Sequence, residues 1–237
     1  MTIQPDAWLA RRMARPAFRL DGVTGIEAAD IVAATAAPGF YYGKVDTADV
    51  AASRALSAAG FYVADVNITL ESTPALVQRR RTPPDRRVEP VTASSSAAVL
   101  DIAGSCFRYN RFHRDPAVPR AVADAIKRDW IQSYVDGTRG DSLLVAFDDG
   151  RPAGFLAALV ANSAAGCVAT IDLVGVASDR QQRGIGADLV LAFAAHYASA
   201  GRLRVGTQAA NLPSLKLYER LGFEIAQTTY VFHRHTT

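Results

Sequence analysis

The stretch that decides the fold runs from Val176 to Leu189 and reads "VASDRQQRGIGADL". It joins an apolar run, "CVATIDLVGV" (167–176), to a helical pattern over residues 187–200 through a polar turn. A helix start leaves backbone N–H groups unpaired at the positive end of the helix dipole, so it attracts anions. Gly184 and Gly186 remove side chains that would keep a phosphate from these N–H groups. The spacing therefore predicts an anion-binding turn, with a tight turn that binds nothing as the alternative.

The flanking sequence predicts further strands and helices. Val122, Ile126, Trp130 and Tyr134 recur at steps of four within residues 117–135, which is typical of one face of a helix. "SLLVAF" (142–147) and "AGFLAALV" (153–160) flank "DDGRP", the signature of a hairpin. Downstream, the predicted elements are a strand "LRVGT" (203–207), a helix "PSLKLYERLG" (213–222) and a closing strand "FEIAQTTYVFHRH" (223–235).

The N-terminal third predicts a smaller unit. "FYYGKVD" (40–46), "TADVAASRALSAAG" (47–60) and "FYVADVNITLE" (61–71) suggest strand, helix and strand, a small βαβ unit. The arginines and prolines of "VQRRRTPPDRRVEP" (77–90) indicate a solvated linker, or else an anion-binding strip. We therefore expect a small N-terminal α/β domain (1–76), a linker (77–92) and a catalytic domain (93–237), whose first helix starts in "TASSSAA" at a Ser or Thr cap.

Bulk properties exclude several classes of protein. The net charge of +3 over 237 residues fits anionic small molecules better than nucleic acid. Cys106 and Cys167 are far apart and show no metal-ligand spacing, and the four histidines show none either, so no metal site is expected. No signal peptide and no run of 18 apolar residues occurs, which predicts a cytoplasmic protein without membrane insertion.

Two motifs in order resemble the GCN5-related N-acetyltransferases. The first, "V-x-V…Q-x-x-G-x-G", comprises Val174, Val176, Gln181, Gly184 and Gly186. The second, "N-x-x-S-x-x-L-Y-x-x-x-G-F", comprises Asn211, Ser214, Leu217, Tyr218, Gly222 and Phe223. The resemblance covers residues 95–237 and implies an α/β fold with a central, mostly antiparallel mixed sheet flanked by helices. A broader stretch looks like the TDP-fucosamine (TDP-4-amino-4,6-dideoxygalactose) acetyltransferases, which carry a small N-terminal domain related to part of the same fold.

The resemblance implies acetyl-CoA as co-substrate, with no metal. Its implied binding residues are Val174, Gly175, Val176, Gln181, Arg183, Gly184, Ile185, Gly186, Ala187, Asn211 and Ser214. The amides of residues 183–187 would hold the pyrophosphate, and the strand at 174–176 would pair with the pantetheine arm. Tyr218 would protonate the departing thiolate, a role that suits a neutral phenol. The alternative for Tyr218 is a half-buried core aromatic.

The base and the acceptor site follow less directly. Asp172, four residues before Val176, is a candidate to deprotonate the incoming amine; the alternatives are a structural carboxylate or no essential base at all. "CFRYNRFHRDP" (106–116) suits a nucleotide-sugar pocket, because arginine forks match diphosphate oxygens and aromatics stack on bases. Its candidates are Arg108, Tyr109, Arg111, Phe112 and His113, with an ordered surface loop as the alternative.

The expected function is direct transfer of acetyl to the amine of a nucleotide-linked amino-deoxy sugar in a ternary complex. The alternative acceptors are an amino acid, a polyamine or an aminoglycoside. A non-catalytic acyl-CoA-binding module is the alternative of another class; Tyr218 disfavours it, since binding alone needs no acid beside the sulfur. Because such enzymes are often dimers, a homodimer is among the partners that the resemblance allows.

Overall fold

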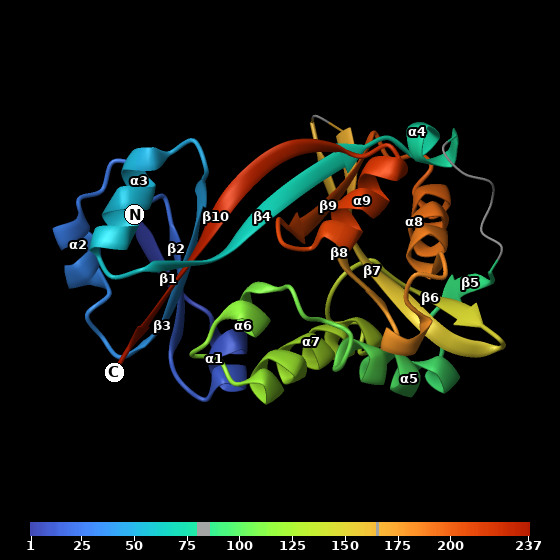
Figure 1. The fold of residues 1–237 in the computed structure, drawn as a ribbon, viewed down its shortest axis with the longest axis horizontal. Helices are drawn as coiled ribbons and strands as arrows, with labels where there is room; N and C mark the ends of the chain where they lie inside the picture. The colour runs from blue at the N-terminus through green and yellow to red at the C-terminus, as the bar shows by residue number, and fades with distance from the viewer. Residues whose placement is uncertain (80–85, 165) are drawn as a thin grey trace.

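The computed structural model describes residues 1–79, 86–164 and 166–237, which form one ten-stranded mixed sheet with helices packed on it (Figure 1). The strand order is β1-β2-β3-β10-β4-β9-β8-β7-β6-β5. The strands are β1 (Thr2–Pro5), β2 (Ala17–Asp21), β3 (Gly39–Asp46), β4 (Tyr62–Ser72), β5 (Val88–Pro90), β6 (Ser142–Asp148), β7 (Arg151–Ser163), β8 (Gly166–Val176), β9 (Arg202–Gln208) and β10 (Glu224–Thr236). The helices are α1 (Ala7–Met13), α2 (Ala28–Ala34), α3 (Val50–Ala58), α4 (Pro74–Arg79), α5 (Ala93–Ala103), α6 (Arg111–Arg114), α7 (Arg120–Val135), α8 (Ile185–His196) and α9 (Leu212–Arg220), with a short 3₁₀ helix at Ser178–Arg180.

The predicted βαβ unit is present as β3, α3 and β4, but β10 lies between its two strands. Both β3 and β4 pair antiparallel with β10, so they run parallel to each other on either side of it. Gly60 follows α3 with a φ of +84°, as expected of a residue that ends a helix. The last strand of the chain therefore completes the N-terminal part of the sheet.

The predicted hairpin and helices of the C-terminal part are confirmed. Asp149 and Gly150 have φ values of +50° and +73°, and two successive positive φ values are typical of a tight hairpin turn. Thr92 and Ser95 form a reciprocal capping box at the start of α5. The expected apolar face of α7 is present, since Ile126 and Tyr134 are buried.

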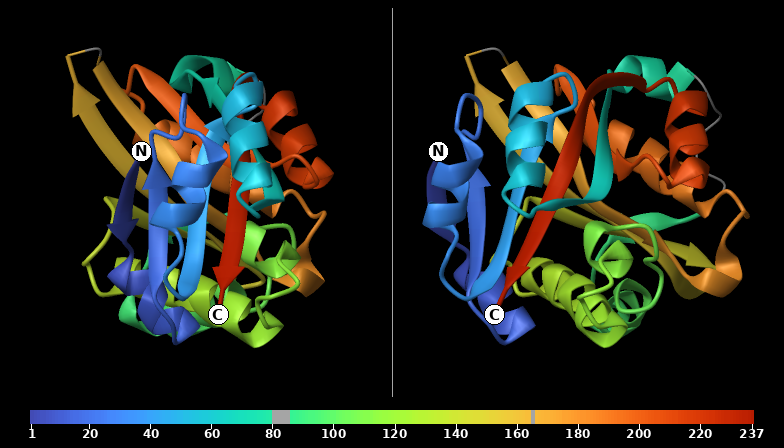
Figure 2. Two further views of the ribbon diagram at one scale, coloured as in Figure 1. Left: turned by 90° about the vertical axis from the view of Figure 1, so that its left-hand side faces the viewer. Right: turned by 60° about the vertical axis from the view of Figure 1, so that its left-hand side comes forward.

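Helices cover the C-terminal part of the sheet on both faces (Figure 2). The helices α5 and α7 pack on one face through a core that includes Val99, Ile131 and Phe155. On the other face α8 packs through Leu189 and Phe193. The two long strands β4 and β10 connect this part to the N-terminal lobe, where both chain ends lie, and α6 and α7 lie beneath them (Figure 1).

The predicted linker is wrong at both of its ends. Residues 77–79 belong to α4, with the Val77 side chain fully buried, and residues 88–90 form β5. Pro90 is compatible with β5 because that strand lies at the edge of the sheet, where a missing N–H leaves no partner unsatisfied. Residues 80–85 lie outside the described residues. The division into domains at 1–76 and 93–237 stays a prediction.

The α/β fold class with a mixed, mostly antiparallel sheet is confirmed, because only β2–β3 and β8–β9 are parallel neighbours. None of the helices in the described ranges combines the length and the apolarity needed to cross a bilayer.

Candidate active site

The predicted anion-binding turn has the expected backbone. Gly184 is the N-cap of α8 with a φ of +85°, a backbone conformation that residues with a Cβ rarely adopt. Its carbonyl accepts the N–H groups of Ala187 and Asp188 at 2.9 and 3.1 Å. The N–H groups of Ile185 and Gly186, in the first turn, have no intrahelical acceptor by geometry. Residues 184–187 therefore form a helix start that suits an anion.

A network of ion pairs fixes this turn to the β6–β7 hairpin. Arg180 donates to Asp148 at 2.8 Å and to Asp149 at 2.9 Å. Arg86 bridges Asp148 and Asp188 at 2.8 and 2.9 Å. Hydrogen bonds from Arg86 and then Arg180 hold the pKa of Asp148 below its usual range. Side chains outside the predicted acetyl-CoA-binding residues therefore hold this turn in place.

The two polar residues predicted within the turn lie at its surface. Gln181 is exposed and its amide donates to the Val176 carbonyl at 3.2 Å. Arg183 is exposed as well, and its guanidinium lies 3.9 Å from Asp148. Asp148 is thus the acidic partner of Arg183 among the described residues, at a distance longer than a hydrogen bond.

The strands β8 and β9 separate beside this turn. They pair in parallel only from Val168–Ile171 against Arg202–Val205, while β8 continues to Val176. On its other side, Val174 to Val176 stay paired with β7. On the β9-facing edge the Val176 carbonyl accepts the Gln181 amide, so the backbone of Val174 is the part left to pair with an extended ligand, and this role stays a prediction.

Two glycines bring neighbouring elements close to this gap. A Cβ on Gly175 would lie 2.7 Å from Cys106 Sγ and 2.8 Å from the Phe155 ring, so only glycine fits there. A Cβ on Gly186 would lie 3.2 Å from Leu217 of α9. Gly186 thus lets α9 approach the start of α8 as well as exposing its N–H.

The helix α9 carries the second motif. Asn211 is its N-cap, and the side-chain oxygen accepts the Ser214 N–H at 3.4 Å, so the structure brings these two predicted residues together. Tyr218 is 2% exposed and packs edge-on against Phe223, with ring centroids 5.6 Å apart. Burial raises the pKa of Tyr218, which keeps its phenol neutral. Tyr218 shares one apolar cluster with Val174 and Val176 of β8.

Asp172 occupies a β-bulge. Ala157 pairs with Leu173 and Ala158 with Ile171, which leaves Asp172 as the extra residue of β8. Its Oδ2 accepts hydrogen bonds from three side chains of the α7 region: Trp130 Nε1 at 2.8 Å, Tyr134 OH at 2.7 Å and Arg139 Nε at 3.0 Å. This geometry ties α7 to the sheet, and the role of Asp172 as a base stays a prediction.

The structure separates the predicted acceptor residues into two groups. Arg108 and Tyr109 are exposed. Arg111 stacks on the Tyr42 and Phe112 rings at 4.0 and 4.3 Å, and Phe112 is 2% exposed. His113 is enclosed as well, with a side chain 3% exposed and Nε2 2.7 Å from Asp124. Phe112 and His113 thus belong to the packing of α6 against α7.

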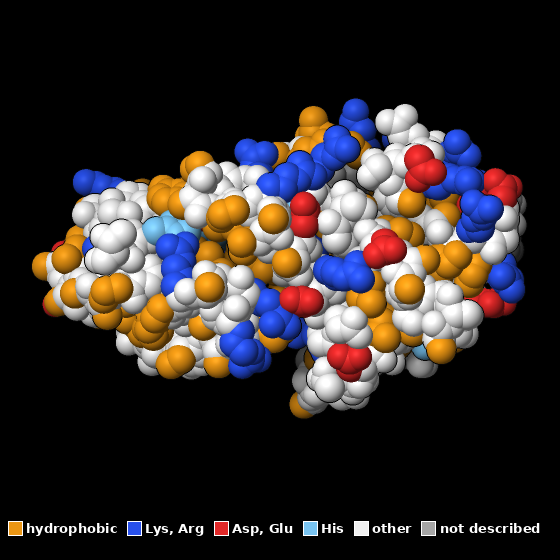
Figure 3. Space-filling model, turned by 90° about the horizontal axis from the view of Figure 1, so that it is seen from below, with side chains coloured by type: hydrophobic (Ala, Val, Ile, Leu, Met, Phe, Trp, Pro, Cys, Tyr) orange, Lys and Arg blue, Asp and Glu red, His pale blue; other side chains and the backbone are white. Residues whose placement is uncertain are grey.

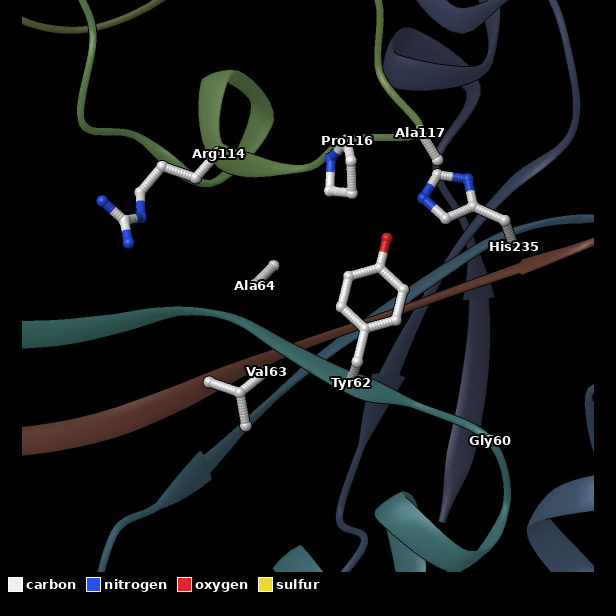
Figure 4. Close-up of a pocket in the computed structure, with 8 residues that line it drawn as sticks. All are labelled: Gly60, Tyr62, Val63, Ala64, Arg114, Pro116, Ala117 and His235. Carbon is white, nitrogen blue, oxygen red and sulfur yellow. The ribbon is translucent and has the colours of Figure 1, made fainter.

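A polar cluster that sequence reasoning missed lies beside a pocket of about 450 Å³ (Figure 4). The buried carboxylate of Asp115 accepts from His233 Nδ1 at 2.6 Å, His235 Nε2 at 2.9 Å and Tyr62 OH at 2.6 Å. Burial favours a raised pKa for Asp115, but these hydrogen bonds outweigh it and hold the pKa well below its usual range. The alternation in "HRH" places His233 and His235 on one strand face, a signal that the sequence did offer.

Asp115, His233 and His235 lie close enough to hold a metal ion, since their possible ligand atoms are within 4.8 Å of one another. The outer nitrogens of the two imidazoles contact arginines, Arg111 at His233 Nε2 and Arg15 at His235 Nδ1. An arginine only donates, so the inner nitrogens carry the protons and point them at Asp115. Burial lowers the pKa of His233 to about 4, in keeping with a neutral ring. The cluster fits a hydrogen-bond network better than a cation site.

Four charged side chains gather on the face of the sheet that α6 and α7 cover: Lys44 of β3, Asp65 of β4, Arg111 and Lys127. Asp65 is 6% exposed, and burial raises its pKa to about 6. Lys127 is 9% exposed, and burial lowers its pKa to about 8. Seen from below, Lys and Arg side chains gather along the middle of the molecule, close to a histidine (Figure 3). Of these four residues the sequence predicts Arg111 as a site residue and misses the others, because the four come from different elements.

Comparison with known proteins identifies the family. Residues 97–223 match the acetyltransferase (GNAT) family. The spore coat polysaccharide biosynthesis protein SpsD of Bacillus subtilis (strain 168) is 27% identical over 155 residues, 65% of this chain and 52% of that protein. The match thus spans about half the length of this curated relative.

Solved structures share the fold. A functionally unknown conserved protein from Staphylococcus epidermidis ATCC 12228 aligns with a TM-score of 0.69 at 12% identity, over 97% of this chain and 89% of that one. A GCN5-related N-acetyltransferase from Kribbella flavida aligns with a TM-score of 0.59 at 16% identity, over 94% and 82%. Since the family match covers more than half of the chain, the protein belongs to the acetyltransferase (GNAT) family, a family of N-acetyltransferases.

Proposed function

We propose that the protein transfers acetyl from acetyl-CoA directly to the primary amine of a nucleotide-linked amino-deoxy sugar of the TDP-4-amino-4,6-dideoxyhexose type. The observation that carries the donor half is the gap between β8 and β9, with the start of α8 at one end and Tyr218 packed against β8. These parts suit a long ligand that is anionic at one end and reactive at the other.

Each part has a stated task in this proposal. The N–H groups of Ile185 and Gly186 bind the pyrophosphate, and Arg183 adds charge beside them. The β9-facing edge of β8 at Val174 pairs with the amide-bearing arm, and backbone N–H groups of this edge stabilise the oxyanion that develops on the thioester carbonyl. Tyr218 donates its proton to the sulfur as the C–S bond breaks.

Support for a sugar acceptor comes from outside the gap. The matched relative is named for spore coat polysaccharide biosynthesis. Independently, the sequence of this chain resembles the TDP-fucosamine acetyltransferases. The cations Lys44, Arg111 and Lys127, on the side of the sheet that α6 and α7 cover, favour an acceptor that carries negative charge. A nucleoside diphosphate meets that requirement, whereas a polyamine does not.

The experiment is a thiol-release assay with acetyl-CoA against a panel of aminosugar nucleotides, free aminosugars, amino acids and polyamines. The proposal expects turnover with aminosugar nucleotides and far less with the same sugars lacking the nucleotide. Turnover confined to amino acids or polyamines would overturn the acceptor class.

The variant Tyr218→Phe tests the acid in the same assay. Removing the hydroxyl should lower kcat by roughly 100-fold or more, as is typical when a general acid is lost. Acetyl-CoA affinity, measured by calorimetry, should stay within about twofold, because the ring and its packing on Phe223 remain. A kcat close to that of the unchanged protein would assign Tyr218 to the core.

A further inference from the structure

We propose that Asp65, on β4 outside both family motifs, takes the proton of the acceptor amine. The inference rests on the proposed function and deepens it, because it assigns the group that generates the nucleophile. It also gives the N-terminal lobe a part in the reaction.

A β-bulge turns Asp65 toward the site. Val231 of β10 pairs with Asp65 and Phe232 with Val63, so Ala64 is the extra residue of β4. Tyr62 and Ala64 face the α6 segment, whereas Val63 points away from it (Figure 4). Regular alternation would turn Asp65 the same way as Val63, but a bulge places two successive residues on one side. Asp65 therefore faces α6, which packs against β4.

The position of Asp65 along the sheet places it beside the gap. β4 pairs with β9, with Asn67 opposite Gln208, and Ala209 donates to the Val66 carbonyl at 2.8 Å. Asp65 is the next residue of β4 beyond this contact. β9 has separated from β8 at this level, since their pairing ends at Val205. Asp65 thus borders the wide end of the gap, on the face opposite α8 and α9.

The carboxylate of Asp65 accepts fewer hydrogen bonds than the carboxylate of Asp172. Within the described part of the chain, its one hydrogen bond comes from the neighbouring Val66 N–H at 2.9 Å, and no ion pair reaches it. Asp172 faces the same layer of helices but accepts three side-chain donors. A buried carboxylate with free acceptor capacity is ready to receive a proton, whereas three side-chain donors already compete for Oδ2 of Asp172.

The charged groups that face Asp65 are Lys44 from β3 and Arg111 and Arg114 from α6, and β10 presents the apolar Val231. Burial raises the pKa of Asp65 to about 6, although the Val66 N–H and the three cations lower it. At pH 7 the carboxylate is therefore charged and still basic enough to accept a proton. The excess of positive charge favours the neutral amine over the ammonium and also suits the phosphates of the acceptor.

Two protons leave the acceptor nitrogen during the transfer. The acceptor ammonium passes one proton to the Asp65 carboxylate, which becomes a carboxylic acid, and the freed amine attacks the thioester carbon. The C–S bond breaks, and Tyr218 protonates the thiolate. The nitrogen loses its second proton as the amide forms, which restores the Tyr218 phenol. Asp65 then releases the first proton to water.

The test compares pH profiles of kcat/KM for the protein and for Asp65→Asn and Asp65→Glu, with the aminosugar nucleotide that turns over in the thiol-release assay. Asp65→Asn should lower kcat/KM at pH 7 by roughly 100-fold and lose the fall in rate below about pH 6, while Glu restores part of both. Asp30→Asn, an exposed change on α2, is the matched control and should change neither. A profile of Asp65→Asn that keeps its acid limb, or a loss under threefold, would overturn the proposal.

Two measurements separate this inference from the proposed function. Acetyl-CoA affinity by calorimetry should be unchanged in Asp65→Asn, so a loss there would mean that the variant damages the donor site. If no amine of the panel is acetylated, ¹³C NMR of the labelled Asp65 carboxyl, titrated with 2-aminoethyl phosphate, replaces the kinetics. A titration near pH 6 that this amine displaces supports the role of Asp65. A signal that the amine leaves in place would contradict it.

Discussion

Replacing Asp65 by asparagine should make the protein more stable at neutral pH, even though it should inactivate it. The pKa of Asp65 is raised from 3.8 to about 6 in the folded chain. The folded state therefore disfavours the charged carboxylate, and asparagine removes that penalty while keeping the shape of the side chain. The difference of about 2 pKa units corresponds to about 3 kcal/mol, at 1.36 kcal/mol per unit.

The sign of the effect defines a pH window. Below pH 3.8 the carboxyl is protonated in both the folded and the unfolded chain, so the penalty is absent. It grows as the pH rises from 3.8 to about 6 and is complete above that value. The stability gained by Asp65→Asn should therefore be close to zero at pH 3.5 and about 3 kcal/mol at pH 8.

The assay is thermal and urea unfolding of both proteins at several pH values. For a chain of this length, about 3 kcal/mol corresponds to a rise in Tm of roughly 6–12 °C at pH 8. Asp172→Asn is the matched control. It should lower the free energy of unfolding by about 2–4 kcal/mol, because it weakens the contacts of Trp130, Tyr134 and Arg139 with β8. A Tm of Asp65→Asn at or below that of the unchanged protein at pH 8 would refute the reasoning.

Three further changes test other parts of the site. Gly184→Asp should weaken acetyl-CoA binding in calorimetry at least tenfold more than Gly184→Asn does. Aspartate and asparagine both tolerate a positive φ, but only the aspartate charge repels a pyrophosphate. Equal losses of affinity would argue against the phosphate turn. Gly175→Ala should destabilise the fold by about 1–3 kcal/mol in urea unfolding, and Cys106→Ala in the same chain should recover part of it, because the new methyl meets the sulfur; an unchanged midpoint would contradict the packing. Asp115→Asn should lower Tm at pH 7 and make stability fall less steeply in acid. The ionised Asp115 carboxylate, whose pKa is held low in the fold, stabilises the protein at neutral pH, and this contribution is lost as the pH falls. Equal pH dependence of Tm in the variant and the unchanged protein would contradict this expectation.

Local signals made the donor half of the site predictable. The glycine turn before α8, the hairpin turn at Asp149 and Gly150 and the cap at Thr92 each depend on a few neighbouring residues, and the sequence pattern indicated them. The V-x-V strand and the α9 motif follow the same logic, so the gap between β8 and β9 could be expected.

The acceptor half could not be predicted, because its residues are set by pairing between distant strands. The bulge at Ala64 exists only where β4 meets β10, and it reverses the side on which Asp65 lies. Arg111 and Phe112 lie on α6, which packs them against Tyr42 and His233, contacts that a local sequence pattern does not show. The edge position of β5 was equally invisible, which is why Pro90 suggested a linker.

The place of β10 between β3 and β4 has a consequence for synthesis on the ribosome. Until residues 224–236 emerge, the facing edges of β3 and β4 lack the strand that pairs with both of them in the described structure, β10. Unpaired edges recruit other strands, so the nascent chain passes through a long interval in which chaperones or misplaced pairing compete for that slot. Pairing with β10 covers both of these edges, so a fragment that stops before residue 224 should be prone to aggregation.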